Sequence, residues 1–235
     1  MLSIADGDII RYKSYFDQAD HNCYILEKDT FLSKVDHQPL GHELLSLKYI
    51  VLAHGASASP TYCHLQNKLY ETSRAYFEMA ENCNSLLAIV SLQSCALLAT
   101  FELQQLLFIR GWDRINRAMW MAEMFDLHKM DAQYESPRQQ QSGLYIAPTT
   151  NPQELEERRR TFWSVFILCC FKSISVGSNT NAQINRMEEV WPLWFSFPFP
   201  TLLLTEESSR LLPCCQVNIK PMTKTHHYGQ PSLKH

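Results

Sequence analysis

NPQELEERRRTFWSVFILCCFKSISVG, residues 151–177, is the stretch that decides the fold. Asn151 offers a side-chain cap, and Pro152 takes the first helical position, where its missing N–H removes no hydrogen bond. Glu154 stands where the acid of a capping box would stand, and Gly177 suits the left-handed residue that ends a helix. The stretch therefore predicts one long helix that begins after Asn151 and ends near Gly177.

Arg158, Arg159 and Arg160 form the only compact basic cluster of the chain. One interpretation is a phosphate contact or a nuclear-import patch. The spacing favours a local role instead, because Glu154–Arg158 and Glu156–Arg160 are i,i+4 pairs with the acid first, each worth about 0.2–0.5 kcal/mol.

Arg159 differs from its neighbours, because it shares a helical line with Phe162 or Trp163 and is expected at the core-facing edge. A half-buried arginine needs a carboxylate partner. Glu102 is the one acid within the most apolar predicted helix, so the hypothesis is an interhelical Arg159–Glu102 ion pair.

The rest of the chain also shows helical periodicity. Residues 85–109 form the most apolar segment, and Glu102 together with nearby glutamines argues for a central core helix rather than a membrane span. A helix over 112–125 is expected to carry one apolar side, made by Ile115, Met119, Ala122 and Phe125.

Towards the N-terminus the boundaries are predicted from local signals. Asp8 is a cap for a first helix, and Thr30 is a possible cap before Phe31. A further helix begins near Leu44 and is expected to end at Gly55, and Ser59-Pro60 is expected to start the next.

Two segments lack helical periodicity. Residues 130–151 are a polar loop, and after about residue 190 proline interrupts the apolar residues, with 6 of the 11 prolines in the last 45 positions. Proline is excluded from helix interiors and central strands. The predicted organisation is therefore an all-α domain of packed antiparallel helices over 1–189 and an irregular, partly disordered tail over 190–235.

Composition limits the function. The 235 residues are 46% hydrophobic, enough for a packed core, and only 7 glycines argue against a turn-rich β architecture. The net charge of −3 disfavours autonomous binding to nucleic acid. Asp6 and Asp8 interrupt any N-terminal signal sequence, and the 8 cysteines include no CxxC pair, which indicates reduced thiols in an intracellular protein.

Catalytic motifs are sparse. His42-Glu43 begins a near miss for the zincin motif HExxH, but Ser46 occupies the place of the second histidine that zinc would need. No GxSxG, P-loop or GxGxxG motif is present. The sequence therefore predicts a protein that is not an enzyme, with a metal hydrolase around His42 and Glu43 as a remote alternative.

Three segments, in order, resemble the fungal-specific transcription factor domain, the middle homology region of fungal zinc-cluster transcription factors. Gln153–Gly177 is similar to its hallmark run EERRRxFWxxFxLDRxxSxxxG. The matching positions are Glu157, Arg158, Arg159, Arg160, Phe162 and Trp163. Ser91–Asp131 resembles the preceding helix pair, which closes on Leu127-His128-Lys129, and Tyr15–Phe31 resembles the opening segment.

The chain also departs from this pattern. Cys169-Cys170 replaces Leu-Asp, Lys172 follows in place of the arginine, and Asn22 replaces a proline of the opening segment. The six-cysteine zinc cluster that reads DNA lies N-terminal to this region in the family, and no such cluster occurs here.

The resemblance implies an all-α, nuclear regulatory module in RNA polymerase II transcription, with a metabolic or a secondary-metabolite gene cluster as alternative targets. It implies no cofactor in this chain, with zinc expected only in the absent DNA-binding domain. The implied partners are other nuclear regulatory proteins or a full-length relative, with DNA contacted only indirectly and no membrane.

Two alternatives stay open beside this one. The chain is a truncated or mispredicted fragment without independent activity, with a tail from a frameshift or retained intron, or it is a small-molecule sensor. A sensor's cavity would be lined by aromatic side chains: Trp112, Trp120, Phe125, Phe162 and Trp163.

Overall fold

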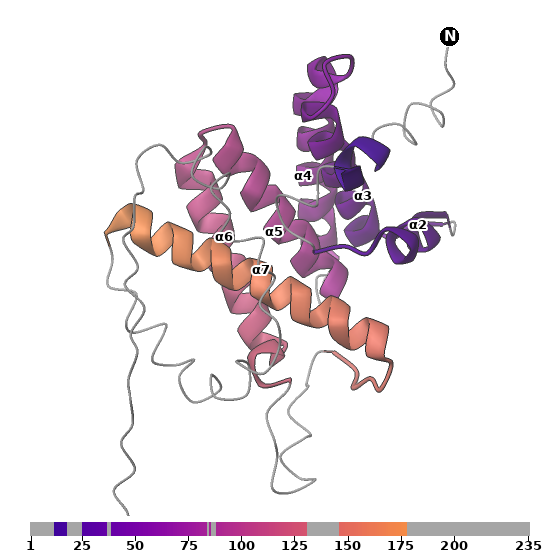
Figure 1. Cartoon of the computed structure of the whole chain (residues 1–235), viewed down its shortest axis with the longest axis vertical. Coiled ribbons are helices and arrows are strands. Elements are labelled where there is room, and N and C mark those ends of the chain that lie inside the picture. Colours follow the sequence, from indigo (N-terminus) through magenta and orange to yellow (C-terminus); the bar gives the residue numbers. More distant parts are fainter. Residues whose placement is uncertain are drawn as a thin grey trace, which may run out of the picture. The chain divides into compact units, whose positions relative to one another are not determined.

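The computed structural model describes residues 12–17, 25–36, 39–83, 85, 88–130 and 146–177. Residues 12–17 are helical, and no β-strand occurs in these ranges. The elements that follow are α2 (Lys28–Asp36), α3 (His42–Ser57), η1 (Cys63–Leu65), α4 (Gln66–Asn82), α5 (Ile89–Gln104), α6 (Phe108–Met124), η2 (Leu127–Lys129) and α7 (Pro152–Val176). The all-α prediction is confirmed, and Figure 1 shows the helices packed against one another.

The centre of the core is α5, which packs against α3, α4, α6 and α7. Its residues are buried from Ser91 through Ala99, and again at Phe101 and Glu102. A helix that is apolar almost all round must be enclosed by protein or by lipid. Among the described residues no helix is both long and apolar enough to cross a membrane, and here other helices enclose α5.

Serine side chains mediate the crossing of α3, α4 and α5. Ser94 Oγ donates to Ser46 Oγ at 2.9 Å, and Ser73 Oγ donates to the Ser46 carbonyl at 2.8 Å. All three residues are fully buried. Small hydroxyl side chains let the helices approach closely, and because they bond to one another their burial leaves no orphaned donor.

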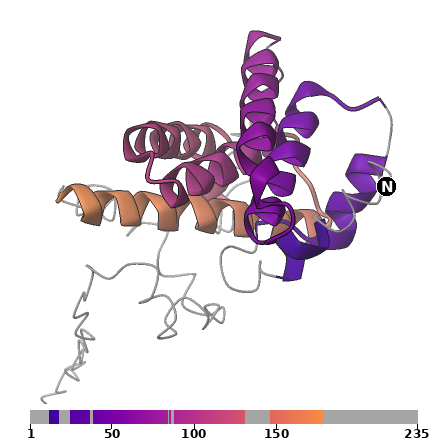
Figure 2. The ribbon, with the colours of Figure 1, turned by 90° about the horizontal axis from the view of Figure 1, so that it is seen from above.

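The longest helix, α7, runs across the α5–α6 hairpin, as Figures 1 and 2 both show. The Asn151 side chain accepts a hydrogen bond from the Gln153 amide at 3.0 Å, and Gly177 adopts a left-handed φ of 65°. Both ends of this helix therefore lie where the sequence predicted them.

The predicted single helix over 85–109 is wrong. Leu106 adopts a φ of 59°, and the Leu107 amide bonds back to the Glu102 carbonyl at 2.8 Å, so the chain turns between α5 and α6. This is the bonding of a Schellman C-cap, which normally uses glycine. A leucine in that position gave no stop signal in the sequence.

Other boundaries also differ from prediction. Gly55 is buried inside α3, which continues to Ser57. The segment begun by Ser59-Pro60 forms turns and η1 before α4 begins at Gln66. Before α2, Glu27 accepts from the Thr30 amide at 2.6 Å, so the glutamate caps the helix that Thr30 was expected to cap.

Several predictions fall outside the described residues. They concern the Asp8 cap, most of the polar loop and the tail over 190–235. On the 112–125 helix, by contrast, the four residues of the predicted apolar side are all buried.

Candidate functional site

Glu157 lies where three helices meet. Lys34 Nζ of α2 donates to its two carboxylate oxygens at 2.7 and 3.0 Å, and Gln93 Nε2 of α5 donates at 2.9 Å. The Glu157 side chain is only 10% exposed, so these contacts replace most of its hydration. One signature glutamate thus connects α7 with α2 and α5.

The three adjacent arginines, Arg158–Arg160, differ from the prediction in which of them faces the core. Arg158 is buried, and its Nη2 donates to the Ala147 carbonyl at 2.8 Å and to Glu154 at 2.6 Å. Arg159 is half-buried and pairs with Glu156 at 3.2 Å, which also accepts from Arg160 at 2.9 Å. The two i,i+4 pairs are therefore confirmed, whereas the residue at the core-facing edge is Arg158 and not Arg159.

The buried face of α7 is turned by about one residue, or about 100° on a helix, from the predicted line. The reason is that Thr161, Ser164 and Ser173 are buried and belong to this face. Thr161 Oγ1 bonds to the Glu157 carbonyl of its own helix at 2.8 Å, which satisfies the hydroxyl without solvent. A reading that counts only apolar residues overlooks such positions.

The predicted Arg159–Glu102 pair is corrected. Glu102 is fully buried, and both of its carboxylate oxygens accept from Arg114 Nε at 3.0 Å. Tyr70 Oη donates to the same carboxylate at 2.9 Å. The need for an arginine was predicted correctly, but the turn at Leu106 brings Arg114 of the neighbouring helix α6 alongside Glu102.

The leucine-histidine-lysine triplet forms η2, which packs against α6 and α7. Leu127 is buried in the core. Burial and, secondarily, the Lys129 charge lower the pKa of His128 below its ordinary value. The Nδ1 atom of His128 is buried and has no hydrogen-bond partner in the described part of the chain.

His42 and Glu43 lie at the N-terminus of α3. The His42 ring stacks on Tyr76 with ring centroids 6.1 Å apart, and the Glu43 carboxylate folds back against Gly41. Within the described ranges no group of three or more His, Cys, Asp or Glu side chains could hold a metal ion.

The five aromatic residues named as cavity lining do not form one wall. Phe125 and Phe162 are buried in the core, whereas Trp120 is 59% exposed. Trp163 packs edge-on against Phe162 and Phe166. Phe125, Phe162 and Trp163 pack in or against the core rather than around one cavity.

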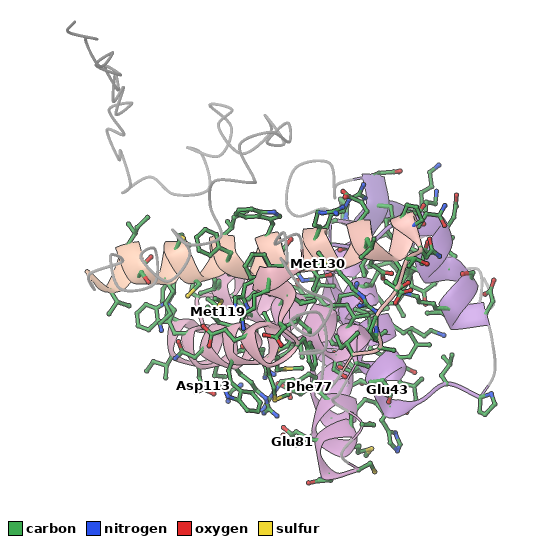
Figure 3. All side chains as sticks on the ribbon, turned by 90° about the horizontal axis from the view of Figure 1, so that it is seen from below. Glu43, Phe77, Glu81, Asp113, Met119 and Met130 are labelled. Atoms are coloured by element: carbon green, nitrogen blue, oxygen red, sulfur yellow. The ribbon has the colours of Figure 1, made fainter. Side chains whose placement is uncertain are left out.

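A pocket of about 170 Å³ lies instead between α4 and α6. Its lining residues are Arg74, Phe77, Glu78, Glu81, Asp113, Arg114 and Arg117. Figure 3 shows Phe77, Glu81 and Asp113 on the same side of the molecule. This site was not predicted from the sequence, because its only signal there is charge on the polar sides of two helices, and the sequence does not show that these helices pair.

The family model described as "Fungal specific transcription factor domain" matches residues 12–190. The chain is 27% identical over 231 residues to the depudecin biosynthesis cluster-specific transcription activator DEP6 of Fusarium langsethiae, covering 97% of this chain and 36% of the relative. It is 30% identical over 191 residues to the DEP6 activator of Alternaria brassicicola, covering 78% of this chain and 29% of that relative.

A third relative is the pigment biosynthesis transcriptional activator pigB of Monascus ruber, 27% identical over 173 residues, with 71% of this chain and 30% of the relative covered. The chain thus spans about a third of the length of these relatives. No solved structure matches it.

Proposed function

Because the chain belongs to the fungal-specific transcription factor domain family, which comprises transcription factors and not enzymes, we propose that it is the regulatory module of a cluster-specific transcription activator. It acts in the nucleus, in RNA polymerase II transcription of a fungal biosynthetic gene cluster. The observation that carries the proposal is the match over residues 12–190, together with relatives that are activators of such clusters.

The chain acts on DNA indirectly, through the DNA-binding domain of a full-length relative or another nuclear regulatory protein. Its formal charge of −3 supports indirect action on DNA, because a chain that binds DNA by itself normally carries a positive charge. Two of the three adjacent arginines are engaged by Glu154 and Glu156 within α7, and Arg159 also pairs with Glu156. Phosphate contact would have to break these pairs first.

The three-helix contact at Glu157 supports a role as a single regulatory body rather than a string of separate helices. Lys34 and Gln93 reach Glu157 from positions 123 and 64 residues away in the chain. These contacts tie α2 and α5 directly to α7.

Disruption of the gene in its native fungus tests the proposal. We expect the transcripts of one contiguous set of biosynthetic genes to fall together, as measured by RNA sequencing. Unchanged transcripts at every biosynthetic locus, under conditions where the gene itself is transcribed, would contradict the proposal and favour an inactive fragment.

Complementation with matched variants links the effect to the fold. Glu123→Lys alters an exposed glutamate of α6 for which the described part of the chain shows no ion pair, whereas Glu157→Lys places a positive charge beside Lys34 in the junction. We expect Glu123→Lys to restore the transcripts and Glu157→Lys to fail, with immunoblots that report the amount of each protein. Full restoration by Glu157→Lys would show that the junction is not needed for the activity.

A further inference from the structure

The pocket between α4 and α6 has a positively charged floor. Arg74, Arg114 and Arg117 are half-buried, and the guanidinium carbons of Arg114 and Arg117 lie 5.6 and 5.2 Å from the Phe77 ring centroid. Arg74 lies over the neighbouring Tyr70 ring at 5.7 Å. Aromatic faces hold all three cations in place, so the floor is built before any ligand arrives.

Each of these arginines has N–H groups left over. Arg114 donates from Nε and Nη2 to Glu102, and Arg117 donates from Nη2 to Glu81. None of these contacts uses Nη1 of Arg114 or Arg117. Arg74 donates from Nη1 to Glu71 at 3.0 Å, and its Nε is buried without an acceptor in the described part of the chain. A guanidinium carries five N–H donors in a fixed fork that suits a carboxylate.

The rim of the same pocket is negatively charged. Glu78, Glu81 and Asp113 line it and are exposed. Glu81 pairs with Arg117 at 2.6 Å, and Glu78 lies 3.6 Å from Arg74. Asp113 forms neither a hydrogen bond nor an ion pair with any residue that the structure describes, so its carboxylate is available to a cation.

We propose that this pocket binds a small zwitterion with the chemistry of a free α-amino acid. The carboxylate lies against the spare N–H groups of Arg114 and Arg117, and the ammonium group faces Asp113. A volume of about 170 Å³ equals that of roughly five to six waters at about 30 Å³ each, which fits an amino acid with a short side chain. This inference goes beyond the proposed function and does not depend on it.

Charge balance favours a zwitterion over a simple anion. The three arginines are matched by three acids in the lining, and Glu102 adds a fourth negative charge directly behind Arg114. An anion alone would meet a surplus of negative charge, and a cation alone would meet the guanidinium floor. A ligand that carries both charges a few ångströms apart complements both layers.

Titration of the whole ¹⁵N-labelled chain with L-alanine, propionate and ethylamine tests the proposal by NMR. The two analogues each carry one of alanine's charged groups. We expect L-alanine at up to about 20 mM to shift the amides of Asp113, Arg114 and Arg117 in a saturable way, within the modest affinity open to so small a ligand. We expect each analogue to bind at least tenfold more weakly.

Equal binding of propionate would overturn the proposal in favour of a simple anion site, and no saturable shift with L-alanine would leave an ordinary solvated pocket. Asp113→Asn gives an independent check, because the exposed residue can change without loss of a native contact. We expect this variant to melt like the parent and to bind L-alanine at least tenfold more weakly.

Glu123→Gln is the matched control, since it neutralises another exposed acid of α6 outside the pocket lining. We expect it to bind L-alanine as the parent does. Equal binding by the parent and Asp113→Asn would show that the ammonium contact is wrong.

Discussion

His54 is a histidine that the fold keeps neutral. Its Nε2–H donates to the Leu97 carbonyl at 3.0 Å, and its ring lies 6.1 Å from the Tyr15 ring and 5.4 Å from the Phe101 ring, between centroids. Burial lowers the pKa of His54 from 6.5 to about 4, although the bond to Leu97 acts in the opposite direction. The imidazole therefore stays uncharged inside the protein at pH values where an exposed histidine takes up a proton.

We expect the free energy of unfolding to fall as the pH is lowered, because of His54. Between pH 6.5 and pH 4 the unfolded chain protonates His54 and the folded chain does not, so the stabilisation present above pH 6.5 is lost as the pH falls. The loss is about 1.4 kcal/mol per pH unit and up to about 3 kcal/mol in all. Urea unfolding at pH 7, 6 and 5 measures it.

The variant His54→Gln keeps an N–H donor for Leu97 but cannot titrate. We expect its free energy of unfolding to depend less on pH than that of the parent. His64→Gln, at an exposed histidine in η1, serves as the control and should follow the parent. Parallel pH curves for the parent and His54→Gln would contradict the assignment.

Glu102 and Arg114 form a buried ion pair whose members depend on each other. Arg114→Met leaves a fully buried carboxylate with only Tyr70 as a donor, and we expect a cost of about 3–5 kcal/mol. Glu102→Gln should also destabilise, and the double variant should lose less than the sum, by about 1–3 kcal/mol. Strictly additive losses in urea unfolding would show that the two side chains are not coupled.

At the level of elements, the α5–α6 turn carries a leucine where glycine would fit better. Leu106 has a φ of 59° and is 72% exposed, so its side chain contributes little packing to offset the left-handed conformation. We expect Leu106→Gly to raise the free energy of unfolding by about 0.5 kcal/mol. The relief of about 1–2 kcal/mol is partly offset by the greater freedom of glycine in the unfolded chain.

Ile109→Gly provides the matched comparison for this turn. Ile109 is 82% exposed but lies in the first turn of α6, where glycine is expected to destabilise by about 0.5–1 kcal/mol. Both variants remove one exposed apolar side chain, so only the backbone conformation distinguishes them. A loss of stability in both would show that Leu106 is not strained.

The α5–α6 turn shows why some helix boundaries could be predicted from the sequence and others could not. Asn151, Pro152 and Gly177 act through local geometry, and the ends of α7 were predicted from them. Leu106 ends α5 against its own preference, because the packing of α6 on α5 requires a turn there. Tertiary contacts decided this boundary, and the error carried into the choice of partner for Glu102.

At the scale of the whole molecule, ion pairs within one helix could be predicted from the sequence, whereas contacts between distant helices could not. Glu154 and Glu156 find arginines on their own helix, as their spacing predicted. Glu157 finds Lys34 across 123 residues, and no periodicity within one helix could have indicated that contact. The pocket between α4 and α6 likewise depends on how two helices pair.

The chain as a whole is expected not to bind duplex DNA by itself. Its net charge is −3, and all three residues of its compact basic cluster are already paired with glutamates of the same helix. Non-specific binding requires free cations that displace counterions from phosphates. We therefore expect no complex at about 10 µM protein in low salt, where basic domains bind readily. Gel-shift or fluorescence-anisotropy measurements test this expectation. A complex that weakens steeply as salt rises would contradict it, because the chain would then bind DNA phosphates without a partner.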